Sequence, residues 1–556
     1  MISQFVKDLK KEFSGYDFKR FTKDLMAGIT VAAVALPLAI AFGIGSVGPD
    51  NPPMVGAAAG MITAIIAGLI MSAFSGASFQ ISGPTGAMTA ILMGLVAQHG
   101  LEGVFMVTFI AGIILIITAL TKCGKLVTYI PTPVITGFTS GIAIIIALGQ
   151  VDNFFGVKAI GDSAITKLIS YFTTPGCFDA NWLAAGVALF TILIMVLWPK
   201  KWGAKVPGSL IAIILATVVC SVFSIDVATI GEIPRKLIAD DRLTFAAFDF
   251  AKMTQFITPA ISIAALGMIE SLLCGAAAGR MKGEKLNADR ELLAQGIGNL
   301  VIPFFGGVPA TAAIARTAVA IKSGCETRLT GIIHAVVLLL SMFLLAPLMA
   351  RVPLSALAGV LMVTAWRMNE WENITYMFKK KMKTGIVMFL ITMVSTVVFD
   401  LTIAIIIGVV GSIIFFVIKI ANIDVTMADV DIKSLSENGI ELNAEHGDTK
   451  MVYIAGPIFF ATIEKLSATM EEIQEKTIVI LSMRAVTLID TSGAVALLEL
   501  CEKFKEEGRC VLFCGVQPKV KKTLEVAGVV DLVGEETFFW DATAAIKHAD
   551  KLLLNK

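Results

Sequence analysis

Long apolar runs separated by short polar segments extend from residue 25 to residue 418. Residues 25–49 and 51–101 contain no Asp, Glu, Lys or Arg. A helix that crosses the hydrocarbon core of a bilayer needs about 20 apolar residues, so the second run is long enough for two. Further apolar segments lie at 103–121, 126–150, 182–198, 206–225, 256–279, 291–305, 310–321, 329–350, 352–366, 384–399 and 401–418. The pattern predicts an α-helical polytopic membrane protein with about fourteen transmembrane segments.

The pattern changes from about Met451, where short apolar runs alternate with amphipathic stretches. Strands are predicted at 451–455, 477–481 and 510–514, and helices at 462–473, from Asp490 to Lys505, and after the third strand. Such alternation builds a sheet covered by helices. We therefore divide the chain into an N-terminal segment (1–23), a transmembrane domain (24–420), and a linker with a soluble α/β domain (421–556).

Composition excludes a purely cytosolic enzyme. Of the 556 residues, 56% are hydrophobic and 16% are charged, whereas soluble proteins have roughly 25% charged residues. The net charge of +1 hides an asymmetry, because residues 421–556 hold 22 of the 44 acidic side chains but 14 of the 45 basic ones. The eight cysteines show no paired spacing, so we expect reduced thiols.

Basic clusters predict the orientation, because loops rich in Lys and Arg stay in the cytoplasm. With an even number of crossings, all clusters fall on one side and the chain returns there at Lys419. We predict a multi-pass protein of the plasma (inner) membrane, surrounded by the lipid bilayer, with both termini cytoplasmic and no cleaved signal peptide. The clusters are the N-terminal segment, Lys122/Lys125, Lys200/Lys201/Lys205, Arg280/Lys282/Lys285, Lys322/Arg328 and Lys379/Lys380/Lys381/Lys383.

Two short segments open with the same pattern of Gly, Pro and small residues. Gly83 and Pro84 open a segment of about 14 residues, which makes a helix roughly 21 Å long. The hydrocarbon core is about 30 Å thick, so this segment is too short to cross it alone. Gly307 to Ala312 open the second segment, and its Pro309 lies 225 residues after Pro84. A second pair of proline-led segments is offset by 220 residues. Matching offsets predict two halves, and seven crossings in each half make the second an inverted repeat.

These openings also predict a binding site. Proline suits the first position of a helix, and the free N–H groups there carry about half a positive charge. Two such ends that meet near the midplane would bind an anion. The alternative is that the small residues only allow close helix packing, but the matching positions favour the site.

Two charged residues lie away from the predicted segment ends. Glu270 is midway along 256–279, and Arg316 is six residues into 310–321, about 9 Å from its start. Charges inside a bilayer are costly and mark transport pathways. We interpret Glu270 as the site of a coupling proton or sodium ion and Arg316 as an electrostatic wall for the anion. A structural ion pair is the alternative.

Energetics support such coupling. One negative charge entering against 100 mV costs about 2.3 kcal/mol, so accumulation needs a cation, an exchanged anion or an outward gradient. One carboxylate can carry one compensating positive charge, which suits a monovalent anion. The histidines form no ligand cluster and no Walker A motif occurs. We expect no enzyme activity, no metal, no cofactor and no nucleic-acid partner.

In the C-terminal domain, Asp490, Thr491, Ser492 and Gly493 precede an apolar helix. Asp490 and Thr491 could be helix caps, or they could mark a surface regulated by phosphate, which is favourable at a helix start. Thr491 and Ser492 are the candidate regulatory residues.

Together the motifs resemble the sulfate permease (SulP) family over nearly the whole chain, with a C-terminal domain similar to the STAS domain. The resemblance implies a seven-plus-seven inverted repeat with a UraA-like core and gate, an elevator-type mechanism, and a homodimer with cytoplasmic STAS domains. The motifs that carry it are 83–87, 269–273, 290–292, 295–299, 305–311 and 314–317.

The resemblance also implies site residues. Glu270 matches the acidic coupling residue of the family, and Gly83, Pro84 and Pro309 break the helices at the site. Many relatives have glutamine where this chain has Leu38. Cys274 and Ile314 stand where a sodium-coupled bicarbonate carrier would offer hydroxyls, which favours proton coupling. The substrate-binding residues would be Phe42, Thr85, Gly86, Ala87, Ala312, Ala315 and Arg316.

We expect secondary active transport of a small anion (bicarbonate, sulfate or a dicarboxylate), coupled to protons or sodium. One alternative is an anion exchanger or channel-like conductor on the same fold. Another is a nucleobase:cation symporter, which Arg316 and the STAS domain disfavour. A cytosolic partner at the STAS domain is a further expectation.

Overall fold

The structure is a computed structural model that divides into two compact units, Met1–Val409 and Val410–Lys556. Each unit is described by itself. Lys125, Lys200, Lys201 and Lys205, which entered the orientation argument, lie outside the described residues. The described residues are 2–48, 51–124, 130–161, 164–175, 178–199, 207–248, 253–399, 401–421, 423–437, 439–473 and 477–554.

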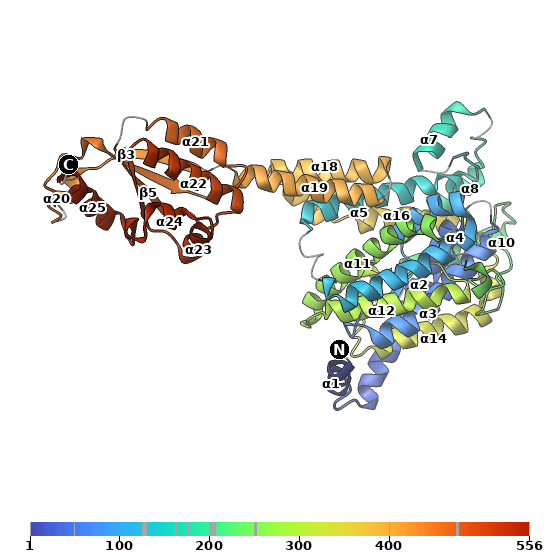
Figure 1. Cartoon of the computed structure of the whole chain (residues 1–556). Coiled ribbons are helices and arrows are strands. Elements are labelled where there is room, and N and C mark those ends of the chain that lie inside the picture. Colours follow the sequence, from blue (N-terminus) through green and yellow to red (C-terminus); the bar gives the residue numbers. More distant parts are fainter. Residues whose placement is uncertain are drawn as a thin grey trace. The chain divides into compact units, whose positions relative to one another are not determined.

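A helix occupies each predicted apolar segment (Figure 1). In the first half these are α2 (Phe18–Val47), α3 (Pro53–Phe74), α4 (Gly86–Leu120), α5 (Thr132–Gly149), α8 (Trp182–Leu197) and α10 (Gly208–Val222). In the second half they are α11 (Thr254–Lys282), α12 (Ala288–Val301), α13 (Ile314–Lys322), α14 (Leu329–Leu344), α16 (Leu354–Met368), α18 (Lys383–Val398) and α19 (Leu401–Ile420). α4 fills two predicted segments, because a break at Gly100 (φ 64°, ψ −173°) divides it.

Length and composition separate these helices into two classes. Five stretches are long and apolar enough to cross a membrane: α2, α3, α4, Thr132–Phe155 and α11. The others among the described apolar helices have 10–17 residues, except α13 with nine and α19 with 20, of which the stretch Ile406–Ile420 falls in the shorter class. Between them lie α1 (Ile2–Glu12), α6 (Val151–Phe155), α7 (Ala164–Thr173), η2 (Phe245–Ala247), η3 (Ile302–Phe305), α15 (Ala346–Met349) and α17 (Trp371–Lys379).

The apolar helices of the first unit pack in two groups. We call α2, α3, α4, α11, α12, α13 and α14 the core bundle, because these helices pack on one another. α5, α8, α10, α16 and α18 form the gate bundle in the same way. The bundles meet where α4 packs on α5 and where α2 packs on α10 and α16. In each half the earlier helices therefore enter the core bundle and the later ones the gate bundle.

Glycines let α2 and α3 approach to backbone contact. A Cβ added at Gly60 would lie 2.0 Å from the carbonyl oxygen of Ala39 and 2.8 Å from the Cα of Gly43. A Cβ at Gly43 would lie 2.2 Å from the carbonyl oxygen of Gly56. Small residues at helix crossings in membranes permit such close packing. They fix the position of α2 against α3 beside Phe42.

We expect Gly60→Val to destabilise the protein by at least about 1–3 kcal/mol, because the added side chain would enter the space of backbone atoms. Gly186→Val is the matched control, since no atom lies within 4 Å of a Cβ added at that position. The apparent melting temperatures of the purified variants in detergent measure the difference. If the Gly60→Val and Gly186→Val proteins had the same apparent melting temperature, this result would contradict the close packing.

The second unit holds a five-stranded sheet in the order β3-β4-β5-β6-β7. β4 (Thr449–Ala455), β5 (Ile478–Ala485) and β6 (Cys510–Cys514) are the predicted strands, and they pair in parallel. Of the helices, α21 (Ile463–Glu471), α22 (Thr491–Glu506) and α23 (Pro518–Val526) pack on one face of the sheet and α25 (Ala542–Leu554) on the other. The unit also contains α20 (Ile432–Glu437), α24 (Val529–Val533), η4 (His446–Asp448) and η5 (Glu535–Thr537).

Two strands were missed by the sequence reasoning. β3 (Asp424–Asp429), which was assigned to the linker, pairs antiparallel with β4 at one edge of the sheet. Its residues are exposed or half-buried and two of them are aspartates, so it lacks an apolar run. β7 (Phe538–Phe539), at the other edge, has two residues and is too short to show a period.

Asp550 of α25 joins that helix to the segment before β4. Its Oδ1 accepts hydrogen bonds from the backbone N–H groups of Ala444 (2.9 Å) and Asn443 (3.1 Å) and lies 3.2 Å from His446 Nε2. Burial alone raises the pKa of this carboxyl, but the hydrogen bonds from Ala444, Asn443 and His446 hold the pKa of Asp550 below its ordinary value.

A carboxyl with a lowered pKa stabilises the fold above its ordinary pKa, and this contribution is lost as the pH falls toward the folded-state value. We therefore expect Asp550→Asn to cost about 1–3 kcal/mol near pH 7. Hydrogen exchange of residues 443–446 in the full chain should be faster in the variant. The difference from wild type should shrink below about pH 4. Exposed Asp531→Asn is the control, and a difference independent of pH would contradict the role of the charge.

Candidate functional site

Two very short strands bring the two predicted helix starts together. β1 (Ser82–Gly83) pairs antiparallel with β2 (Thr311–Ala312), with Ser82 opposite Ala312 and Gly83 opposite Thr311. The N–H of Ala313 also donates to the carbonyl oxygen of Ile81 at 3.0 Å. α4 begins just after β1 and α13 just after β2. The starts of α4 and α13, which are far apart in the chain, therefore lie next to each other beside one small sheet.

The sequence reasoning expected the two prolines at the first helical positions, but the structure places both of them before the helices. Pro84 precedes Thr85, the N-cap of α4, and Pro309 precedes β2. Arg316 is therefore in the first turn of α13, and the expected depth of six residues is wrong. The reason is that residues 311 and 312 are extended, because their backbones pair with β1.

The start of α4 connects three helices. The hydroxyl of Thr85 accepts a hydrogen bond from the N–H of Met88 at 3.4 Å and donates to Oε2 of Glu270 in α11 at 2.9 Å. A Cβ at Gly86 would lie 3.0 Å from the ring of Phe42 and 2.4 Å from Ile146 Cδ1. Gly86 therefore lets a side chain of α2 and one of α5 pack against the helix start.

Arg316 is buried beside β1, with 1% of its surface exposed. Its Nη2 donates to the carbonyl oxygen of Pro84 at 2.7 Å. A Cβ at Gly83 would lie 2.6 Å from Nη1, so glycine is needed at that position. Within the described part of the chain, Nη1 is buried without a hydrogen-bond partner.

The two membrane charges are held by adjacent residues. Glu270 bonds to Thr85, and Arg316 bonds to Pro84. The two charges lie within electrostatic reach of each other. The guanidinium and the first N–H groups of α4 and α13 each contribute positive charge at one place in the core bundle, and such groups favour the binding of an anion.

The structure brings most of the predicted site residues to these helix starts. Ala87 and Ala312 are buried within the packing, and Thr85, Gly86 and Phe42 are also buried. Ala315 is exposed on the first turn of α13, so open space adjoins this helix start. The sequence reasoning missed the polar residues that support β2.

Those supports bind the backbone around β2. Asn299 of α12 accepts from the N–H of Ala310 (2.8 Å) and donates to its carbonyl oxygen (2.9 Å). Thr63 of α3 bonds in the same two ways to Val308, at 2.7 and 2.9 Å. Both are polar residues inside apolar segments, and that was the signal that could have identified them.

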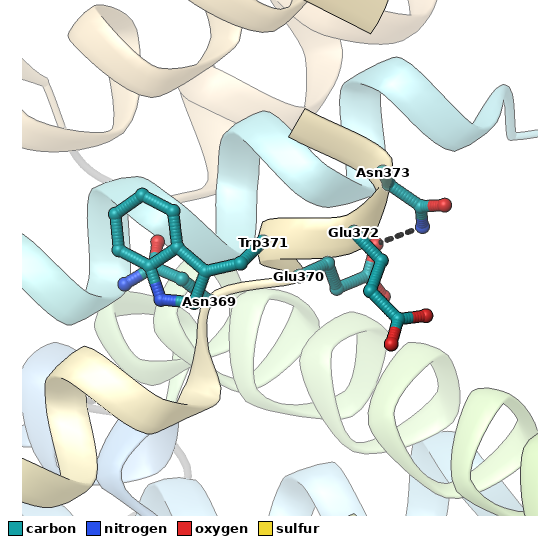
Figure 2. Close-up of a pocket in the computed structure, with 5 residues that line it drawn as sticks. All are labelled: Asn369, Glu370, Trp371, Glu372 and Asn373. Atoms are coloured by element: carbon teal, nitrogen blue, oxygen red, sulfur yellow. Dashed lines mark hydrogen bonds between the residues drawn. The ribbon is translucent and has the colours of Figure 1, made fainter. Parts of the chain in front are cut away.

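A separate surface pocket lies where α16 joins α17. Figure 2 shows the side chain of Asn373 bonded to Glu370 there, at 2.8 Å. Glu370 also accepts a hydrogen bond from Thr136 of α5 at 2.6 Å. The pocket adjoins the gate bundle at the end of α16 and contains none of the predicted site residues. It is lined by Asn369, Glu370, Trp371, Glu372 and Asn373.

In the second unit, Asp490 is the N-cap of α22, and its Oδ1 accepts from the N–H of Gly493 at 2.7 Å. Thr491 and Ser492 are exposed in the first turn of that helix. The cap reading is therefore right for Asp490, while a phosphate-regulated surface at Thr491 and Ser492 stays a prediction.

We expect Thr85→Val to loosen the start of α4, because valine keeps the shape of threonine but removes the cap. Loss of a cap costs about 1 kcal/mol, and Glu270 would lose a hydrogen-bond donor as well. Thr85→Ser retains the hydroxyl and is the control. Hydrogen exchange of residues 86–95 reports the effect. Equal exchange in the valine and serine variants would show that the hydroxyl does not hold this helix start.

Comparisons with known proteins match two separate stretches of the chain to two families. The sulfate permease family matches residues 21–392, and the STAS domain matches residues 442–543. The putative sulfate transporter YvdB of Bacillus subtilis is 36% identical over 537 residues, which cover 95% of this chain and 97% of that protein. The bicarbonate transporter BicA of Synechocystis is 31% identical over 559 residues, 96% and 95% of the two chains.

Solved structures show the same fold. The murine anion transporter Slc26a9 in an inward-facing state is similar with a TM-score of 0.83 at 16% identity, over 97% of this chain and 93% of that one. The transmembrane domain of a cyanobacterial BicA is similar with a TM-score of 0.59 at 30% identity, over 72% and 98%. The predicted helical membrane fold with an α/β C-terminal domain is confirmed.

Proposed function

Because this chain belongs to the sulfate permease family and carries a C-terminal STAS domain, we propose that it is a secondary active transporter of a small anion. The resemblance predicted from its motifs is thus confirmed, and the family is one of multi-pass membrane transporters rather than enzymes. Relatives over almost the whole chain are named as sulfate and bicarbonate transporters. Bicarbonate, sulfate and a short dicarboxylate are the proposed substrates.

The pairing of β1 with β2 is the observation that carries this proposal. It places two helix starts and Arg316 together, and these groups stabilise negative charge. In the proposed pocket, Phe42 and Gly86 form the wall at α4, with Thr85 and Ala87 beside them. At α13 the pocket is formed by three residues. Arg316 and Ala315 lie in the first turn of the helix, and Ala312 lies in the preceding strand.

Glu270 is the proposed coupling residue. The Thr85 hydroxyl donates to its carboxylate and also caps α4, so a cation on Glu270 changes the bonding at the anion pocket directly. The thiol of Cys274 donates to Thr317 at 3.4 Å, and Ile314 offers no side-chain oxygen. Since sodium prefers oxygen ligands, these residues favour a proton as the coupling ion.

The placement of the site supports an elevator-type mechanism. Phe42, Thr85, Glu270 and Arg316 all belong to helices of the core bundle or to the turns that precede them. A movement of this bundle against the gate bundle would therefore carry the anion and the coupling residue together. We further propose a homodimer in the plasma (inner) membrane with both termini in the cytoplasm, where the STAS domain would meet a cytosolic partner.

We expect Glu270→Gln to abolish concentrative anion uptake driven by a pH or sodium gradient, because the amide cannot carry the compensating charge. Anion binding to the purified variant should stay measurable. Uptake into proteoliposomes and equilibrium binding give the two readouts. Glu372→Gln, on an exposed side chain of α17, is the control. Coupled uptake at the wild-type level in Glu270→Gln would remove Glu270 from this role.

The substrate is identified by comparing the binding of sulfate, bicarbonate and fumarate at two pH values, with and without sodium. Arg316→Gln should weaken the binding of the preferred anion, since it removes the buried charge. Anion flux that neither saturates nor accumulates substrate would favour the channel-like alternative. Binding of a nucleobase without any anion would contradict the proposal altogether.

A further inference from the structure

The N-terminal helix α1 (Ile2–Glu12) has two faces of different chemistry. Phe5, Asp8 and Glu12 are spaced by three and four residues and so share one side of the helix. These side chains are half-buried. Lys7, Lys10 and Lys11, together with Val6, are exposed on the remaining surface. The carboxylates of α1 therefore point one way and its lysines another.

The inner face is bound to the core bundle by two arginines. Arg328, which precedes α14, donates from Nε and Nη2 to Glu12 Oε2, at 2.9 and 2.8 Å, and from its backbone N–H to Oε1 at 2.7 Å. Nη1 of Arg290 in α12 donates to Asp8. The ring of Phe5 lies 5.4 Å from each of the two guanidinium carbons. The side chain of Arg290 is 8% exposed and that of Arg328 is 5% exposed. Ion pairs to these buried arginines make α1 an integral part of the packing of the core bundle.

A short connection holds α1 near the start of α2, the first helix long and apolar enough to cross a membrane. Five residues join Glu12 to the start of α2 at Phe18, and such a connection spans at most about 20 Å. Arg20 folds this connection back by donating to the carbonyl oxygens of Ser14 and Glu12, at 3.1 and 3.2 Å. The side chain of Phe18 is 81% exposed, and the apolar run of α2 begins seven residues later, at Leu25. The lysines of α1 are thus within reach of the headgroups.

We propose that Lys7, Lys10 and Lys11 bind the headgroups of anionic phospholipids, and that α1 thereby senses the charge of the leaflet in which α2 begins. Anionic headgroups attract basic residues next to transmembrane helices, and an amphipathic helix with a lysine face suits the interface. Asp8 and Glu12 do not oppose this attraction, because their charges are compensated by Arg290 and Arg328. The bound lipid would act on the same bundle that holds Arg316 and Glu270. The proposal does not depend on the transported substrate.

Hydrogen exchange of residues 2–16 tests the proposal in the full chain. The protein is placed in nanodiscs of phosphatidylcholine alone or with about 30% phosphatidylglycerol. We expect slower exchange with phosphatidylglycerol, on the order of fivefold for each bound lysine, and a smaller effect in about 0.5 M NaCl. The triple variant Lys7→Gln, Lys10→Gln and Lys11→Gln should lose the dependence on lipid charge.

A matched variant removes the same charge elsewhere. This triple variant changes three exposed lysines at the end of α17: Lys379→Gln, Lys380→Gln and Lys381→Gln. It should keep the wild-type response of residues 2–16. Glu12→Gln should speed exchange in both lipids while keeping their ratio, because it weakens only the inner face. The proposal is overturned if wild type ignores phosphatidylglycerol or if the α1 triple variant still responds to it. It is also overturned if soluble glycerol phosphate gives the same protection in phosphatidylcholine alone.

Discussion

The pairing of two residues with two others, β1 with β2, is the contact on which the rest of the candidate anion site depends. Backbone groups in a bilayer must be satisfied within the protein, and extended backbone is tolerated only where it is buried in protein. Here Asn299 and Thr63 bind the backbone just before β2, so the extended stretch is satisfied on both sides. With that stretch fixed, α4 and α13 start side by side. In α4 the Thr85 hydroxyl caps the N–H of Met88, so the N–H groups before Met88 are the ones that could bind a ligand.

The same pairing makes a buried arginine tolerable. A guanidinium inside a bilayer is expensive unless it is paired or bonded, and the carbonyl oxygen of Pro84 accepts from Arg316 because β1 brings it there. Gly83 lets the guanidinium lie against the strand, and the charge of Glu270 is nearby. Since one positive and one negative group balance each other at this place, adding an anion and a cation together preserves that balance. This balance is the electrostatic basis of the cation coupling proposed above.

Sequence reasoning found those features of the fold that repeat along the chain. Each apolar run became a helix, and the strands with apolar runs in the second unit were placed within a few residues. It failed where structure comes from pairing rather than from periodicity: β2 has two residues, so Arg316 was placed too deep, and β3 is a polar edge strand. Thr85 and Glu270 could be nominated from their motifs, but their hydrogen bond joins residues 185 apart. The contact of α1 with Arg328 spans an even longer separation of 316 residues.

The division into bundles connects the local chemistry to movement. Proposed contacts to the anion and to the coupling ion come from one bundle, while the gate bundle reaches the site at Ile146, whose side chain packs by the start of α4. An apolar contact of this kind has no hydrogen bond to break, so it can slide at lower cost than the bonded contacts inside the core bundle. The bonds that hold α1 to α12 and α14 lie on the core side of this boundary. In the proposed elevator movement, a shift of the core bundle would carry α1 with it, so the proposed binding of α1 to lipid headgroups would make the transport step depend on lipid charge.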